Sequence, residues 1–296
     1  MLSQSIPNFT AQTAAGLDQP IWLAGRFSWP VGANDRPLVM GIVNVTPDSF
    51  SDGGQHMTRE FAIRHGELLI AEGADILDVG GESTRPGAPE VAVEVELARV
   101  LPVIRALVAG GHCVSIDSRK PEVMREAIAA GASVVNDVMA LNAAGAIAVC
   151  AESDVGVVLM HMQGQPGTMQ AAPVYGDVLA EVSDFLRSRA LVCEAAGISR
   201  ERIVVDPGFG FGKTLEHNLL LTKQLDRLVA LGYPVLAGWS RKGTLGTLTG
   251  RAVAAERVHA SVAAALACVQ RGARIVRVHD VAATVDALKV WRAMTV

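Results

Sequence analysis

Eight short apolar runs recur along the chain, and most of their residues are β-branched. Apolar residues follow one another in these runs with little alternation, which is typical of strands that are buried on both faces. The predicted strands span residues 38–43, 76–79, 114–116, 134–135, 157–160, 203–205, 235–237 and 275–278.

Most segments between these runs carry apolar residues at helical spacing. In the segment that begins at Asp177, the apolar stripe includes Val178, Val182 and Leu186. The predicted helices span residues 58–72, 90–109, 121–130, 142–151, 177–196, 216–231, 253–271 and 281–294.

The loops differ between the two ends of the predicted strands. Each return from a helix to a strand is short and usually contains a glycine, such as Gly73 or Gly131, which can adopt the left-handed C-cap conformation. Loops from a strand to a helix are often longer and polar. Eight such units predict an α/β protein, a (β/α)8 TIM barrel with its site at the C-terminal face. A doubly wound open sheet is the alternative, but it would not collect polar residues from every strand.

Residues 1–36 precede the first barrel strand. Residues 21–29 fit a short hairpin that covers the bottom of the barrel, and residues 1–18 are expected to form a flexible tail. No linker interrupts the remaining chain, so residues 37–296 are predicted to be a single catalytic domain.

The composition excludes several classes of function. Of the 296 residues, 50% are hydrophobic, 4% are aromatic, and the net charge is −4, so neither a basic field nor stacking platforms for nucleic acid are present. No apolar run reaches the length of a membrane span, and the first twenty residues lack the pattern of a secretory signal. The four cysteines form no Cys-x-x-Cys pair. We therefore expect a cytoplasmic protein with reduced thiols that acts on small molecules and binds neither nucleic acid nor membranes.

Polar residues stand directly after the predicted strands, where a barrel places its active site. Any one of them could be a helix cap, because Asp and Asn are common caps. Polar residues after all eight strands are hard to explain by capping alone. They include Asn44, Asp48, Ser83, Thr84, Arg85, Asp117, Asn136, His161, Asp206, Ser240, Lys242, Arg277 and His279.

The residue types indicate what such a site would bind. Asp117, Asn136 and Asp206 offer acceptors and one amide, which suit a flat heterocycle with several N–H donors. Asn44 and Asp48 are oxygen ligands of the kind that Mg²⁺ accepts together with phosphate oxygens. Arginine makes forked contacts to phosphate, so an anion site is predicted from Arg85, Arg277, His279, Ser83 and Thr84. The point charge of Lys242 comes between the two sets.

A glycine-rich segment spans residues 207–214 and ends in Lys-Thr, as phosphate-binding loops do. Its spacing is one residue too short, and Pro207 stands where the first glycine would be required. We interpret it as a turn that presents Phe209 or Phe211 to a flat ligand, and we expect Phe211 to form a pocket wall.

Eight motifs occur in a fixed order along the chain: Gly41 to Gly53, Asp78 to Gly87, Ser115 to Asp117, Val135 to Asp137, Leu159 to Gly164, Asp206 to Lys213, Ser240 to Lys242 and Arg277 to Asp280. In these motifs, from about residue 38 to the C-terminus, the chain resembles the dihydropteroate synthases. That family joins a pterin to 4-aminobenzoate in folate biosynthesis.

The resemblance implies roles for the candidate residues. The pterin would bind to Asp117, Asn136, Asp206 and Lys242. The pyrophosphate would be held by Arg277, His279 and a Mg²⁺ ion on Asn44. Two loops, with Asp48 and with Ser83, Thr84 and Arg85, would close over the site.

The resemblance also implies a pocket for 4-aminobenzoate, in which sulfonamides would bind. Its frame would be Thr84, Pro86, Phe211, Ser240 and Lys242. The residues expected to act in catalysis are Asp117, Lys242, Asp48 and Arg85. The family further suggests a homodimer.

The implied activity condenses 6-hydroxymethyl-7,8-dihydropterin pyrophosphate with 4-aminobenzoate by an SN1-like mechanism, giving 7,8-dihydropteroate and pyrophosphate. One alternative is a related barrel that transfers a methyl group from methyltetrahydrofolate. Such a barrel has no pyrophosphate to bind, so Arg277 and His279 favour the synthase. The other alternative is a catalytically silent pterin-binding paralogue, which the retention of every site position disfavours.

Two short segments depart from the common family pattern. Residues 118–120 read Ser-Arg-Lys where many members have Thr-Ser-Lys or Thr-Tyr-Lys. Residues 239–243 read Trp-Ser-Arg-Lys-Gly where the family often has Met-Ser-Arg-Lys-Ser. Neither segment removes an expected contact, so both bear on pocket shape and inhibitor affinity.

Overall fold

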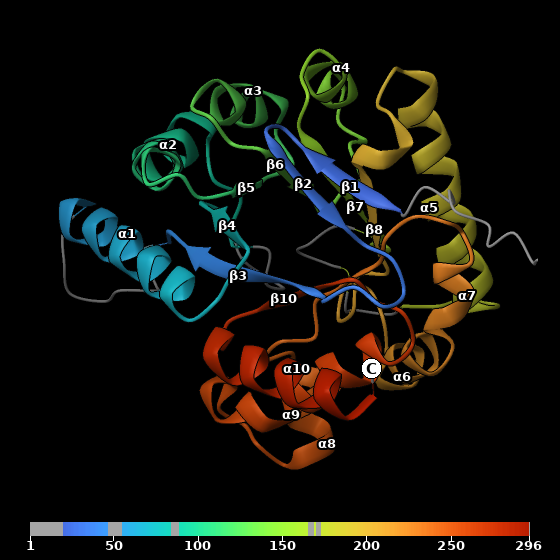
Figure 1. Cartoon of the computed structure of the whole chain (residues 1–296). Helices are drawn as coiled ribbons and strands as arrows, with labels where there is room; N and C mark the ends of the chain where they lie inside the picture. Colours follow the sequence, from blue (N-terminus) through green and yellow to red (C-terminus); the bar gives the residue numbers. More distant parts are fainter. Residues whose placement is uncertain (1–19, 47–54, 84–88, 165–168, 170–172, 296) are drawn as a thin grey trace, which may run out of the picture.

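A computed structural model describes residues 20–46, 55–83, 89–164, 169 and 173–295, except for the side chains of 55–58. The predicted tail lies outside these residues. Eight parallel strands form the central sheet, and all of them lie where the apolar runs predict strands (Figure 1). They are β3 (Leu38–Asn44), β4 (Ile76–Gly80), β5 (Val114–Asp117), β6 (Val134–Asp137), β7 (Gly156–Met160), β8 (Ile203–Asp206), β9 (Leu236–Ala237) and β10 (Ile275–Val278).

The sheet closes on itself. Its strand order is β8-β7-β6-β5-β4-β3-β10-β9, so β8 and β9 stand at the two ends. An isolated parallel bridge between Val205 and Val235 joins these ends, and the Val205 N–H donates to the Pro234 carbonyl oxygen at 3.0 Å. A doubly wound sheet would keep two open edges. The predicted (β/α)8 barrel is therefore confirmed.

Helices surround the barrel (Figure 1). Most lie where they were predicted: α1 (Gln55–Ala71), α2 (Val93–Ala109), α3 (Pro121–Ala129), α4 (Ala146–Ala151), α5 (Val178–Ala195), α6 (Leu215–Lys223), α7 (Leu225–Val229), the 3-10 turn η3 (Ala254–Arg257), α9 (Val258–Val269) and α10 (Val281–Thr295). The predicted helix 216–231 is two helices, because Gln224 has a non-helical φ of −117° and ψ of 30°. Helix α8 (Gly243–Thr249) was predicted to be loop, since most of its residues are Gly and Thr, which are poor helix formers.

The predicted hairpin consists of β1 (Ile21–Ala24) and β2 (Phe27–Pro30), which pair antiparallel across one end of the barrel (Figure 1). Trp22 is completely buried, and its indole N–H donates to the Arg202 carbonyl oxygen, just before β8, at 3.3 Å. It belongs to an apolar cluster formed at the beginnings of the barrel strands by Leu38, Met40, Ile76, Cys113, Val134, Val158, Val204, Leu236 and Ile275. The N-terminal end of the barrel is therefore filled with apolar side chains.

Successive side chains of a strand point to opposite faces, so every second residue faces the barrel interior. The apolar cluster under the hairpin contains the inward residues at the strand starts, whereas Val39, Leu77 and Val135 belong to the outer core that packs on the helices. At the other strand ends, the same alternation reaches Asn44, Asp78, Asp117, Asn136, Asp206 and Arg277. One periodicity thus gives the barrel an apolar bottom and a polar top.

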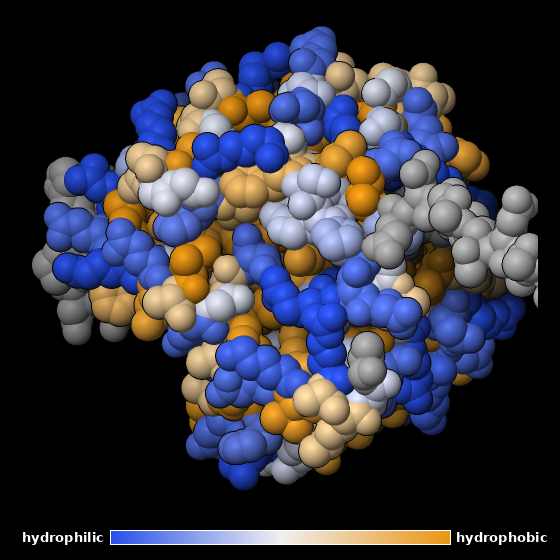
Figure 2. All heavy atoms as spheres, in the orientation of Figure 1, coloured by the Kyte–Doolittle hydropathy of each residue, from blue (hydrophilic) through white to orange (hydrophobic). Residues whose placement is uncertain are grey.

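Figure 2 shows hydrophilic and hydrophobic side chains interspersed over the hairpin side of the molecule. No single helix in the described part of the chain is both long and apolar enough to cross a membrane. Helix α8 meets that condition only together with η3 and α9, across a bend of 75°. The four cysteines are buried and free.

Candidate active site

Arg277 lies between two carboxylates inside the C-terminal end of the barrel. Its Nε donates to Asp78 Oδ2 at 2.5 Å, and its Nη2 donates to Asp117 Oδ2 at 2.6 Å. Burial raises the pKa of Asp117 to about 7, with a further increase from Asp78, although Arg277 acts in the opposite direction. Burial also lowers the pKa of Arg277, but the two carboxylates hold it above its usual value. The arginine thus stays charged, while Asp117 has a pKa close to neutral pH.

Asn136 lies on the other side of Asp78. Its Nδ2 donates to Asp78 Oδ2 at 3.0 Å, and both residues are buried. Asp78 was not among the predicted site residues, yet it contacts two of them. A carboxylate inside an otherwise apolar strand was the signal that could have identified it, because buried charges require partners.

Asp206 and Lys242 complete this group of charges. Burial raises the pKa of Asp206 above its usual value. A hydrogen bond from the Gly208 N–H at 2.7 Å and the charges of Lys242 and Arg277 offset only part of this increase. Burial lowers the pKa of Lys242 to about 8, with a further decrease from Arg277. Asp206 and Asp117 oppose that decrease. Side chains from β5, β8, β10 and the loop after β9 therefore act on one another's charge.

The glycine-rich loop after β8 brings an aromatic ring to Lys242. The Lys242 Nζ lies 3.9 Å from the centroid of the Phe211 ring, a cation–π contact. Phe209 is buried instead and stacks on Trp239, with ring centroids 4.8 Å apart. Of the two phenylalanines considered from the sequence, Phe211 is the one beside a predicted site residue.

Lys213 holds this loop against the end of β7. Its Nζ donates to the carbonyl oxygens of Gly208 at 3.1 Å and Phe211 at 3.0 Å, and it lies 2.9 Å from His161 Nδ1. Burial lowers the pKa of Lys213 to about 7 and that of His161 to about 3, so His161 is neutral and Nδ1 accepts. Gly208 has a φ of 68°, and a Cβ there would collide with the His161 carbonyl oxygen. His161 was predicted to stand at a strand end, but neither it nor Lys213 was assigned a role.

Ser240 and His279 are hydrogen-bonded to each other. Ser240 Oγ accepts from the His279 backbone N–H at 3.0 Å and lies 3.0 Å from His279 Nδ1. Ser240 Oγ can donate to Nδ1 or accept from it, and when it donates, a neutral imidazole carries its own proton on Nε2. Between Ser240 and Lys242, Arg241 has a φ of 57° and forms a forked pair with Asp280, at 2.5 and 3.1 Å. This pair ties the loop after β9 to the end of β10.

Two predicted residues lie at the edge of this group. Asn44 ends β3 opposite Gly80 of β4, and Ser83 is half-buried just after β4. Among the described residues, no group of three or more His, Cys, Asp or Glu side chains lies close enough together to bind a metal ion. The remaining predicted residues lie outside the described part of the chain: Asp48, Thr84, Arg85 and Pro86.

A group of charged residues, here called the stem cluster, comprises Glu82, Glu96, Arg119 and Lys120. Lys120 Nζ donates to Glu82 and to Glu96 Oε2, the latter at 2.6 Å, and Glu96 is almost fully buried. Arg119 Nη2 lies 3.1 Å from Glu82 Oε1 and 2.9 Å from Glu90 Oε1. Burial raises the pKa of Glu82, but Lys120 and Arg119 hold it below its usual value. The stem cluster therefore joins the start and the end of the loop after β4.

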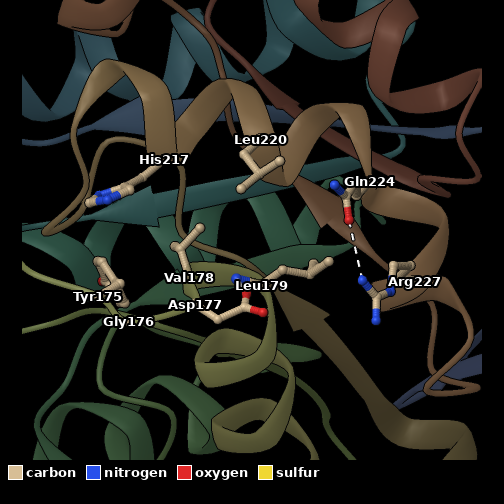
Figure 3. Close-up of a pocket in the computed structure, with 9 residues that line it drawn as sticks. All are labelled: Tyr175, Gly176, Asp177, Val178, Leu179, His217, Leu220, Gln224 and Arg227. Atoms are coloured by element: carbon tan, nitrogen blue, oxygen red, sulfur yellow. Dashed lines mark hydrogen bonds between the residues drawn. The ribbon is translucent and has the colours of Figure 1, made fainter.

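A separate cavity of about 350 Å³ lies between the N-terminus of α5 and helices α6 and α7 (Figure 3). Tyr175, Leu179, Leu220 and Arg227 are among its walls, and none of the predicted site residues is. The Tyr175 hydroxyl donates to the Gly212 carbonyl oxygen at 2.8 Å. The cavity thus borders the glycine-rich loop from outside the barrel and is distinct from the polar group inside it.

Residues 40–279 match the family model described as pterin binding enzyme. A dihydropteroate synthase from Neisseria meningitidis serogroup B is 55% identical over 280 residues, which cover 93% of this chain and 97% of that protein. The Escherichia coli dihydropteroate synthase is 49% identical over 259 residues, covering 87% of this chain and 92% of the relative.

Solved structures are similar over nearly the whole chain. Dihydropteroate synthase from Xanthomonas albilineans with 4-aminobenzoic acid is 56% identical, has a TM-score of 0.87 and covers 93% of this chain and 98% of that one. The same enzyme with 7,8-dihydropteroate gives a TM-score of 0.81 at 56% identity, with coverages of 88% and 94%. The Yersinia pestis enzyme in a sulfonamide drug complex gives 0.87 at 42% identity, with coverages of 93% and 98%.

Proposed function

The chain belongs to the pterin-binding enzyme family, among its dihydropteroate synthases, and on this premise we propose how its residues carry out the reaction. It condenses 6-hydroxymethyl-7,8-dihydropterin pyrophosphate with 4-aminobenzoate to give 7,8-dihydropteroate and pyrophosphate. Similar enzymes that bind 4-aminobenzoic acid and 7,8-dihydropteroate support these substrates. The observation that carries the assignment of residues is the inward-facing polar group at the barrel top, where carboxylates and an amide stand beside two cations.

The pterin ring is bound by Asp117, Asn136, Asp206 and Lys242. The ring presents several N–H donors in one plane, and the carboxylate and amide oxygens supply matching acceptors. A site built from such buried groups rejects ligands that leave them unpaired. Phe211, whose ring faces Lys242 Nζ at 3.9 Å, supplies an apolar wall beside the charged edge.

The pyrophosphate is held by Arg277 and His279, and Asn44 would hold a Mg²⁺ ion beside it. An amide oxygen at the strand end fits this ion, because Mg²⁺ bound with phosphates takes only one or two protein ligands. When bound, the ion neutralises part of the charge on the leaving group. When Ser240 donates to Nδ1, the contact leaves the His279 proton on Nε2 and orients it as a donor.

The substitution is dissociative. The bond between the pterin methylene carbon and the pyrophosphate oxygen breaks, and its electron pair leaves with the oxygen. The remaining cation is delocalised into the pterin ring, where the Asp117 carboxylate stabilises it electrostatically. The amine nitrogen of 4-aminobenzoate attacks the methylene carbon and then loses a proton to solvent. No covalent enzyme intermediate is required.

The 4-aminobenzoate site lies beside Phe211, Ser240 and Lys242, together with Thr84 and Pro86. Asp48 and Arg85, which lie outside the described residues, keep the catalytic roles that the resemblance implies. Sulfonamides occupy the same site, as the drug complex of the Yersinia pestis enzyme supports.

We place the enzyme in the cytoplasm as a homodimer. Four buried free thiols agree with a reducing compartment. Around α8 and α10, which both contact α9, Leu248, Val253 and Val290 are each more than half exposed. Such a face fits an isologous contact between two copies.

Pyrophosphate release from the dihydropterin substrate with Mg²⁺, measured with and without 4-aminobenzoate, tests the proposal. Dihydropteroate, identified by mass, should form at enzyme-like turnover, and pyrophosphate should also be released without the amine. Release that strictly requires 4-aminobenzoate would contradict the dissociative step. Binding of the pterin without product would favour the silent paralogue or the methyltransferase, which a corrinoid methyl-transfer assay separates.

A further inference from the structure

Asp78 is a buried carboxylate that no part of the proposed reaction uses. It lies on the inward face of β4, between the apolar barrel bottom and the polar top, and is 0% exposed. Its Oδ2 accepts from both Arg277 and Asn136, at 2.5 and 3.0 Å. Within the described residues, its Oδ1 has no hydrogen-bond partner. All of its observed hydrogen bonding is therefore directed at two residues of the active site.

The two residues that donate to Asp78 come from strands that are not neighbours of β4 in the sheet. Strands β6 and β10, which carry Asn136 and Arg277, each stand two places from β4, on opposite sides. The two side chains meet at Asp78 through the interior and not along the sheet. A single atom, Asp78 Oδ2, thus links the proposed pterin and pyrophosphate subsites.

The contact also decides which way the Asn136 amide faces. Because Asp78 Oδ2 already accepts from the Arg277 Nε, it can only be an acceptor toward Asn136. Asn136 must donate its NH₂ group to that atom, which leaves its carbonyl oxygen for a ligand. Without Asp78, the amide could rotate and present either group.

We propose that Asp78 is a positioning residue that makes Asn136 a hydrogen-bond acceptor toward the pterin and holds Arg277 through its Nε. This inference rests on the proposed function for the identity of the ligand. The oxygen of Asp78 that carries its hydrogen bonds is occupied by the two protein donors, so through this atom Asp78 acts on the ligand only by positioning them. Its contribution should appear in pterin binding and only through Asn136 and Arg277.

A double-mutant cycle tests this role with calorimetric binding of 6-hydroxymethylpterin pyrophosphate, an unreduced analogue of the substrate. We expect Asp78→Ala and Asn136→Ala each to weaken binding by about tenfold or more, because a buried polar contact is lost or misoriented. The double variant should bind more weakly than either single variant but by less than the product of the two losses, because both changes remove the same contact between Asp78 and Asn136. The KM for 4-aminobenzoate should change less than twofold in Asp78→Ala, about the limit of resolution.

Asp75 provides a matched control, because it also pairs with an arginine but precedes β4 at the opposite end of the barrel. Its carboxylate accepts from Arg36 at 2.5 and 2.9 Å. Asp75→Asn should leave pterin binding unchanged. Asp78→Asn keeps the shape and one acceptor but allows both amide orientations, so we expect a loss of about threefold to tenfold. It also serves if Asp78→Ala does not fold.

Additive losses in the cycle, or wild-type pterin affinity in Asp78→Asn, would overturn the inference. A loss in Asp78→Asn equal to that in Asp75→Asn would do the same. The proposed function has a separate readout, the formation of dihydropteroate by the unchanged enzyme. An active wild-type enzyme with unaffected Asp78 variants would refute only the role of Asp78.

Discussion

Arg277 and Asp117 lie 160 positions apart in the chain, and their side chains meet at 2.6 Å inside the barrel. Arg277 is proposed to hold the leaving pyrophosphate, and Asp117 is proposed to stabilise the cation that remains. Without substrate, these opposite charges neutralise each other. If pyrophosphate engages Arg277 as proposed, the carboxylate of Asp117 should lose part of its pairing and become available to the carbon on which positive charge develops. Binding of the leaving group thus prepares the site for the cation.

The pH dependence of catalysis should report the ionisation of Asp117. Its pKa is raised to about 7, so the carboxyl is protonated below that pH and cannot stabilise a cation. We expect kcat/KM for the pterin substrate to fall about tenfold for each pH unit below about 7. Asp117→Asn should lose most activity and also this acid limb. An unchanged acid limb in the residual activity of Asp117→Asn would contradict the assignment.

Lys242→Ala should lower kcat/KM by about a hundredfold or more while the protein stays folded, because a charge beside the pterin is removed. Burial lowers the pKa of Lys242 to about 8, so the wild-type activity should also fall as pH rises through that value and the lysine loses its proton. Steady-state kinetics and thermal unfolding measure both effects. Lys289→Ala, on the exposed surface of α10, is the control and should behave like wild type. Near-normal turnover of Lys242→Ala would overturn its role.

Asp206→Asn should also lose most activity, by about a hundredfold, because a charged acceptor for the pterin becomes neutral. The variant should fold, since the amide oxygen can still accept from the Gly208 N–H that now donates at 2.7 Å. Circular dichroism and turnover should be compared with those of Asp226→Asn, a change on the exposed side of α7. If Asp206→Asn turned over at the wild-type rate, another residue would have to bind the pterin.

The stem cluster predicts unequal costs for two adjacent substitutions. Lys120→Met leaves Glu96, which is 1% exposed, without its cation, and should lower the free energy of unfolding by about 3 kcal/mol or more. Arg119→Ser, which introduces the serine that many family members have, removes more exposed pairs and should cost about 1 kcal/mol or less. Urea unfolding of both variants checks the difference. Equal losses would show that the buried pair is not the stronger one.

Sulfonamides should compete with 4-aminobenzoate but not with the pterin. Because the sulfonamide and 4-aminobenzoate occupy the same proposed pocket beside Phe211 and Lys242, a sulfonamide should raise the apparent KM for 4-aminobenzoate and leave kcat unchanged. Initial rates at several concentrations of each substrate measure this. A sulfonamide that lowered kcat at saturating 4-aminobenzoate would indicate a second binding site.

The barrel strands were predictable because a strand buried on both faces has a continuous run of apolar residues in the sequence. Helix α8 was not, since Gly243–Thr249 lacks both helix propensity and a clear apolar stripe. The break at Gln224 was missed because the apolar spacing continues across α6 and α7. Local pattern therefore located the repeating units but not these irregularities.

The active site was only partly predictable for a related reason. A polar residue after a strand is visible in the sequence, and ten of the predicted residues lie in the described part of the chain. Which of them touch depends on the barrel interior, as the contact of Arg277 with Asp117 illustrates. Asp78 was missed because it precedes the end of its strand, and its proposed role depends on partners from two other strands.

The hairpin under the barrel has a consequence for the order of events. Trp22 and the apolar cluster around it fill the N-terminal end, so in the described part of the chain the barrel interior opens only at the C-terminal end. Both substrates must enter, and both products must leave, through the opening at the other end. If one substrate is bound behind the other in this opening, the deeper one has to enter first. A barrel that opens at one end thus favours an order of substrate binding that no individual side chain determines.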